Sequence, residues 1–74
     1  MNKYILRKLH AAGLDAKPVK LTGNKNGIMV YHDYFGLYPN AETMRKHNAV
    51  ENIARAAGLR SEQRGHYTAT LIYC

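Results

Sequence analysis

The chain has 74 residues, a length that suits one domain and leaves no room for a second. Hydrophobic residues make up 46% of it, which is enough for a small core and argues against disorder. Eleven Lys and Arg residues outnumber five Asp and Glu residues, so the formal net charge is +6. Such an excess favours a polyanion or an acidic protein surface as the partner.

Cysteine content and hydropathy indicate the compartment. Cys74 is the one cysteine, so no intrachain disulfide can form, as is usual in a reducing environment. The apolar run near the N-terminus is too short for a signal peptide, and no stretch approaches the length of a membrane span. We therefore expect a cytoplasmic protein that does not bind a membrane.

The four residues Ala-Ala-Gly-Leu occur twice, at 11–14 and at 56–59. Each copy follows a helical pattern and precedes a strand-like one. Glycine readily takes the left-handed conformation that ends a helix, and the leucine after it packs back on the last turn. The repeat predicts that one helix ends at Gly13 and another at Gly58.

The first of these helices spans about residues 2–12 and is amphipathic. Ile5 and Leu9 share one side, whereas Lys3 and Arg7 lie opposite and make the outer face cationic. A strand over 16–21 should follow. Its Pro18 lacks a backbone N–H, so this strand has an irregular start or an unpaired side.

Residues 22–27 contain the clearest turn in the chain. Asn26-Gly27 suits the positive dihedral angles of a tight hairpin, and Lys25 makes the tip basic. The second strand then runs from Ile28 to about Tyr34. We expect two antiparallel strands joined at this tip.

The second helical region is less regular. Lys46 falls on the apolar side of a single helix, and Asn48 with Glu51 matches a capping box. We therefore expect a short helical turn near 41–46 that is followed by, or kinked into, a main helix at about 49–57. The apolar stripe of that main helix consists of Val50, Ile53, Ala54 and Ala57.

The final segment, 66–73, alternates β-branched and aromatic residues, which predicts a third strand. The chain is thus an α+β protein with one small two-layer domain, in the order α-β-β-α-β. We expect a three-stranded antiparallel sheet, with the first strand in the middle and both helices on one face. The other face should carry Lys20, Met29, Tyr31, Thr68, Thr70 and His66.

Charge and tyrosine content together indicate function. A basic surface with interleaved tyrosines can neutralise phosphates and stack bases. We expect a non-enzymatic module that binds nucleic acid or a nucleoprotein complex. Tyr31, Tyr34 and Tyr38 lie together around a turn and suit contact with a partner. The residues expected to bind are Lys20, Lys25, Tyr31, Arg45, Lys46 and Arg64.

Two other functions remain open. The first is a small accessory or inhibitor protein, of the type found in phages and mobile elements, that docks an acidic surface of a nucleic-acid-handling host enzyme. The second is a small ribonuclease-like toxin that uses His32 with Asp33, and His66 near Arg64. The spacing of the four histidines fits no metal site, and no cofactor is expected. An exposed edge strand would allow two copies to pair.

Overall fold

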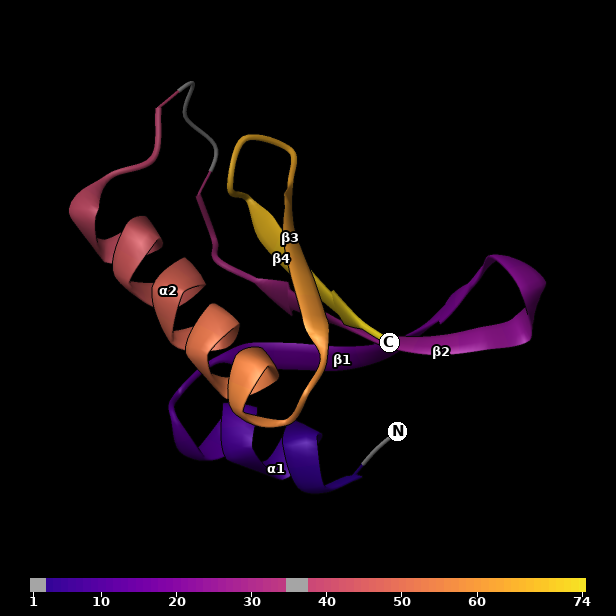
Figure 1. Cartoon of the computed structure of the whole chain (residues 1–74). Coiled ribbons are helices and arrows are strands. Elements are labelled where there is room, and N and C mark those ends of the chain that lie inside the picture. Colours follow the sequence, from indigo (N-terminus) through magenta and orange to yellow (C-terminus); the bar gives the residue numbers. More distant parts are fainter. Residues whose placement is uncertain (1–2, 35–37) are drawn as a thin grey trace.

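The computed structural model describes residues 3–34 and 38–74, in which two helices pack on a four-stranded antiparallel sheet (Figure 1). The strands are ordered β1-β2-β4-β3 across the sheet. The α+β class is confirmed. The elements in chain order are α1 (Lys3–Ala11), β1 (Asp15–Leu21), the 3-10 turn η1 (Thr22–Asn24), β2 (Lys25–Tyr31), α2 (Ala41–Ala56), β3 (Arg60–Arg64) and β4 (Ala69–Tyr73).

Both helices end as the Ala-Ala-Gly-Leu repeat predicts. Gly13 has a φ of 78°, and the N–H of Leu14 donates to the carbonyl of Leu9 at 3.0 Å, as in a Schellman motif. Gly58 repeats this ending after α2, with a φ of 74°. The predicted start of the first helix at residue 2 lies outside the described residues.

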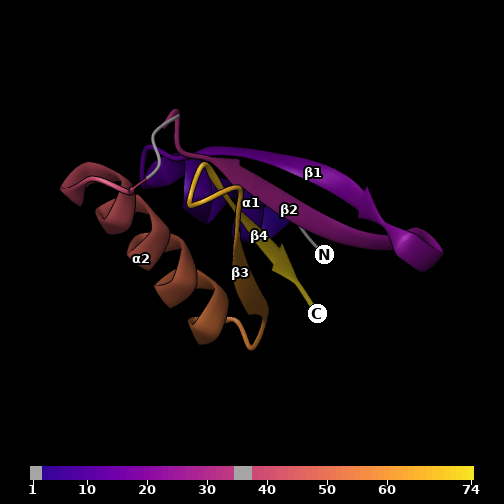
Figure 2. The same cartoon turned by 90° about the horizontal axis from the view of Figure 1, so that it is seen from above.

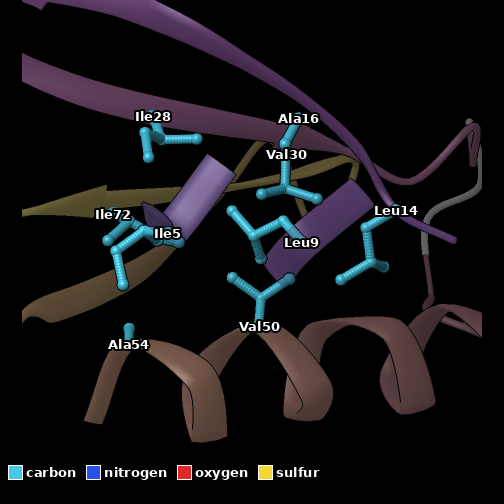
Figure 3. Packing of buried hydrophobic residues seen from close by; sticks show 9 residues of the cluster. All are labelled: Ile5, Leu9, Leu14, Ala16, Ile28, Val30, Val50, Ala54 and Ile72. Carbon is cyan, nitrogen blue, oxygen red and sulfur yellow. The ribbon is translucent and has the colours of Figure 1, made fainter. Parts of the chain in front are cut away.

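The hydrophobic core lies between the sheet and the two helices. Figure 3 shows Val50 and Ala54 of α2 pointing toward Leu9 and Ile5 of α1. The sheet contributes Ala16, Ile28, Val30 and Ile72 to the same cluster. Both helices therefore cover one face of the sheet, as expected. Within the described residues, neither helix combines the length and the apolar character needed to cross a membrane.

The expected break in the second helical region is wrong, because α2 is continuous over 16 residues. Asn40, not Asn48, caps its N-terminus, and its Oδ1 accepts from the Thr43 N–H at 2.8 Å. The buried stripe begins with two polar residues, Thr43 and His47, before it reaches Val50. A search for apolar residues alone therefore finds only the second half of the helix.

The expected number and order of strands are also wrong. The sequence 60–64 is polar throughout, yet it forms β3 and pairs with β4 across the turn at 65–68. Four consecutive residues of β4 are buried, so this strand lies inside the sheet between β2 and β3. The first strand lies at an edge, not in the middle. This position suits Pro18, which has no N–H for a second neighbour.

The hairpin between β1 and β2 extends beyond the rest of the sheet (Figures 1 and 2). β2 pairs with β1 along its full length, whereas it pairs with β4 only from Ile28 to Tyr31. We refer to residues 19–27, which project past β4, as the arm.

The tight turn of the hairpin is displaced from its predicted position. It lies at η1, where Gly23 and Asn24 have positive φ angles of 77° and 59°, and not at Asn26-Gly27. Gly27 is instead required for close packing. A Cβ there would lie 3.1 Å from the carbonyl oxygen of Ile72 and from the side chain of Leu21.

Substitution at the second glycine cap tests the helix ends. Gly58→Ala should lower the free energy of unfolding by about 1 kcal/mol, because a Cβ is disfavoured at positive φ although the surrounding space is open. Gly58→Asn should cost less, since asparagine tolerates this conformation. Urea unfolding of the three proteins measures the difference. Equal stabilities for Gly58→Ala and the parent would contradict the assignment.

Candidate functional site

Within the described residues, neither helix packs on the face of the sheet opposite the hydrophobic core, and we call this face the open face, although Ala69 and Leu71 at its centre are little exposed. Strand register places its residues in rows, such as Lys17–Met29–Leu71–Glu62. Cations lie toward both edges and an apolar strip runs between them. The residues that share this side are Asp15, Lys17, Val19, Leu21, Lys25, Met29, Tyr31, Arg60, Glu62, Arg64, Ala69, Leu71 and Tyr73.

Three of the predicted binding residues belong to the open face. Tyr31 and Arg64 flank Ala69 in one row, although they come from distant parts of the chain. Lys25 follows the turn at the end of the arm and is exposed. Lys20 belongs to the other side of the arm, where its Nζ donates to Asn26 Oδ1 at 3.0 Å.

The remaining two predicted residues, Arg45 and Lys46, do not join this surface. Both belong to α2, which packs against the opposite face of the sheet. Arg45 donates to Glu42 Oε1 at 3.0 Å, and this hydrogen bond lowers the pKa of the Glu42 carboxyl. Arg45 and Lys46 therefore cannot share one contact surface with Tyr31 and Arg64.

The predicted composition of the open face is partly wrong. Met29 and Tyr31 lie there, but Thr70 is completely buried on the helix side, and Thr68 and His66 belong to the β3–β4 turn. The sequence pattern predicts Lys20 and Thr70 on the open face, whereas in β1 and β4 the residues next to them in sequence lie on that face. β1 turns Ala16 toward the helices, so its larger apolar residues face outward on the open side.

The predicted binding residues omit Lys17, Arg60 and Tyr73, which also lie on the open face. Lys17 Nζ lies 5.6 Å from the centre of the Tyr31 ring. Arg60 was assigned to no strand because 60–64 has no apolar alternation. In this segment the sequence offers only the charge of Arg60, and charge does not predict a strand.

One hollow brings the arm, β3 and β4 together, and we call it the arm hollow. Lys25 comes from the arm and Arg60 from β3, and Tyr73 of β4 lies between them in the lining. The hollow has a volume of about 650 Å³. No carboxylate side chain occurs among its described lining residues, which are Leu21, Asn24, Lys25, Asn26, Arg60, Tyr73 and Cys74.

A second hollow lies at the other end of the open face, beside Tyr31, and we call it the Tyr31 hollow. Its volume is about 400 Å³. The Tyr31 ring is 40% exposed, and its neighbour Ala69 is small enough to leave space. This hollow is electrostatically mixed, because Asp15 and Asp33 line it together with Lys17.

On the helix side, a buried polar chain links β2, β4 and α2. Thr70 Oγ1 lies 2.7 Å from His32 Nε2 and 2.9 Å from His47 Nδ1. His47 Nε2 lies 3.1 Å from Glu51 Oε1. His32, His47 and Thr70 are all buried, so these contacts replace water between α2 and the sheet.

The proton positions follow from the acceptors. A carboxylate can only accept, so His47 Nε2 donates to Glu51. With a neutral His47, Nδ1 then accepts the Thr70 hydroxyl proton, and His32 Nε2–H donates to Thr70. His32 Nδ1 is left buried with no hydrogen-bond partner in the part of the chain that the structure describes. Burial, with smaller contributions from His47 and Lys46, lowers the pKa of His32.

These groups do not form an accessible catalytic site. Thr70, His47 and Glu51 have the composition of a nucleophile with its base and carboxylate, but the Thr70 hydroxyl is fully buried. His32 is 2% exposed and is held by Thr70, whereas Asp33 beside it faces solvent. A phosphodiester outside the protein therefore does not reach the His32 ring. The arrangement instead cross-links α2 to the sheet.

The β3–β4 turn closes over this chain. Gly65, His66 and Tyr67 have consecutive positive φ angles of 56°, 54° and 70°. The Tyr67 ring packs edge-on against His47 with centroids 4.8 Å apart, and its N–H donates to Gln63 Oε1 at 3.0 Å. These contacts hold a bulky residue in the left-handed region, where it is otherwise rare.

Comparisons of the chain with protein-family models, curated proteins and solved structures found no match. Function is therefore inferred from the residues and geometry of this chain.

Removing the central hydroxyl tests the buried chain. Thr70→Val keeps the β-branched shape but leaves His32 Nε2 and His47 Nδ1 without their partner, so stability should fall by about 2–4 kcal/mol. Thr68→Val is the matched control, because its hydroxyl makes an exposed bond to the Arg64 carbonyl and its loss should cost under about 1 kcal/mol. Chemical denaturation provides the values. Similar losses for both variants would contradict the role of Thr70.

The lowered His32 pKa gives stability a defined pH dependence. Above about pH 6.5 the ring is neutral in both states. As the pH falls below that value, the unfolded chain takes up a proton that the folded protein resists, so stability is progressively lost toward the lower, folded-state pKa. Urea unfolding at pH 7.5 and 5.5 should show this loss.

Two variants assign the effect to one histidine. His32→Gln retains a donor toward Thr70 and should show a smaller loss between these pH values. His66→Asn removes an exposed histidine and should leave the parent's loss unchanged. An unaltered pH dependence in His32→Gln would refute the assignment.

Proposed function

We propose that this protein is a non-enzymatic module that binds nucleic acid, alone or within a nucleoprotein complex, through the arm hollow and the open face. The observation that supports this most directly is the arm hollow. Lys25 and Arg60 are 35 positions apart in the sequence, yet they line one hollow with Tyr73, and none of its described lining residues has a carboxylate side chain. Two cations beside an aromatic ring can hold a phosphate and the adjoining base.

The charge distribution supports the same surface. Of the two carboxylates of the open face, Asp15 pairs with Tyr31 at the end away from the arm. Glu62 lines a hollow with Leu21 of the arm, but Arg64 binds it at 2.7 Å. The arm itself contains Lys20 and Lys25 and no acidic residue, so a polyanion approaching it encounters positive charge.

The burial of His32 argues against the ribonuclease-like alternative, which needs His32 together with His66. His66 is exposed but His32 is inside the protein, and the surface around the arm hollow offers cations, amides and a tyrosine. Such groups recognise phosphates and bases without reacting with them. An acidic protein surface is the competing partner, and the salt dependence of binding separates the two.

A pair of charge reversals tests this proposal. Binding of short oligonucleotides should weaken steeply with salt, and Lys25→Glu should reduce the slope of log K against log salt by about 1. Lys8→Glu makes the same charge change on α1, across the sheet, and should alter the slope little because screening limits its reach to about 8 Å at physiological salt. Fluorescence anisotropy across a salt series measures both.

Equal effects of the two reversals would indicate attraction by net charge alone and would reject the arm hollow as the site. Absence of oligonucleotide binding at low salt, with a single or a double strand, would reject nucleic acid as the partner.

A further inference from the structure

We propose that the open face binds the unpaired bases of a single strand, with Tyr73 and Tyr31 as the two stacking rings. This inference rests on the proposed function and specifies its ligand. Lys25 and Arg60 account for attraction to any phosphate backbone, single or double. The two tyrosines and the space beside each of them supply a preference for bases that are free to stack.

The first stacking position is Tyr73 in the arm hollow. Its ring borders this hollow on one side and, on the other, a smaller one of about 330 Å³ that Leu71 and Leu21 also line. The Tyr73 hydroxyl donates to Glu62 Oε2 at 3.3 Å, and Arg64 binds the same carboxylate. These contacts restrain the ring before a ligand arrives, which lowers the entropy cost of binding.

The second stacking position is Tyr31. Lys17 lies over its ring, an interaction worth only about 0.5–1 kcal/mol at an exposed site. A stacked base contributes more, about 1–3 kcal/mol, so it can displace the lysine from the ring face. The freed ammonium group then lies close enough to contact the adjoining phosphate.

The carboxylates near Tyr31 fit a base better than a phosphate. Asp15 and Asp33 line the Tyr31 hollow and would repel a backbone placed there. Their oxygens can accept hydrogen bonds from the amino groups of bases. The expected arrangement has bases directed into the hollows, while the backbone follows Lys25, Arg60 and Lys17.

The two positions are joined along the sheet. Tyr31 pairs with Ala69, and Tyr73 follows four residues later on β4, about 13 Å away. Met29 lies between them and is partly exposed, and it forms an apolar floor beside the buried Leu71. A duplex conceals the faces of its bases in its own stack, so only a single strand can use this floor and both rings.

The test compares four ligands: single-stranded DNA and RNA, the duplex of the same sequence, and an abasic strand that retains the phosphates. The parent protein should bind both single strands about tenfold or more tightly than the other two ligands. Tyr31→Leu and Tyr73→Leu should each weaken single-strand binding several-fold and leave abasic binding unchanged. Tyr4→Leu is the control, since Tyr4 is 66% exposed and also has a lysine over its ring, but belongs to α1 on the other side of the sheet.

The outcomes separate the inference from the function on which it rests. Salt-dependent binding that is equal for all four ligands and insensitive to both sheet tyrosines would overturn base stacking and retain a phosphate-binding function. If the protein binds none of the four ligands at low salt, both the stacking inference and the nucleic-acid function are overturned, and a protein partner is favoured. Tyr31→Phe keeps the ring and should bind single strands as tightly as the parent protein does. Thermal melting verifies that each variant is folded.

Discussion

The burial of β4 on both sides is the constraint on which the architecture depends. Four consecutive residues, from Ala69 to Ile72, are at most 6% exposed, so this strand needs neighbours on both edges and cover on both faces. β2 and β3 supply the edges, and the helices cover one face. On the other face, larger residues of the neighbouring strands flank β4, with Leu71 between Met29 and Glu62. Polar β3 and Pro18-bearing β1 are consequently left at the borders of the sheet, where an unpaired side is tolerated.

The same strand organises the polar interior. Ile72 lies in the hydrophobic core, but two positions earlier Thr70 meets His32 and His47, where the apolar cluster ends. Hydrogen bonds there replace hydrophobic contact between α2 and the sheet. A core this small obtains part of its cohesion from such bonds, and the polar chain also restricts how α2 and the sheet are arranged.

Placing both helices on one face leaves the other face for contact. The outward residues of β4, Leu71 and Tyr73, form the middle of an apolar strip, and cations from the arm and β3 lie at its border. The arm extends this surface because the part of β2 before Ile28 pairs with β1 but not with β4. Shape and charge thus coincide at the arm hollow, where three separate segments of the chain meet.

The sequence by itself determined those features whose cause lies in residues close together along the chain. Glycine at positive φ ends both helices, the periodicity of Ile5 and Leu9 specifies the buried side of α1, and the α+β class follows from the order of these patterns. It also indicated a basic, tyrosine-bearing surface, and Lys25, Tyr31 and Arg64 do lie on the open face.

Only the tertiary structure decided the features that depend on a partner distant in the sequence. His47 is polar and becomes part of a buried stripe because β4 supplies a hydroxyl, and 60–64 becomes a strand because β4 needs an edge neighbour. Arg60 and Tyr73 adjoin Lys25 through strand pairing, which residue spacing along the chain does not encode.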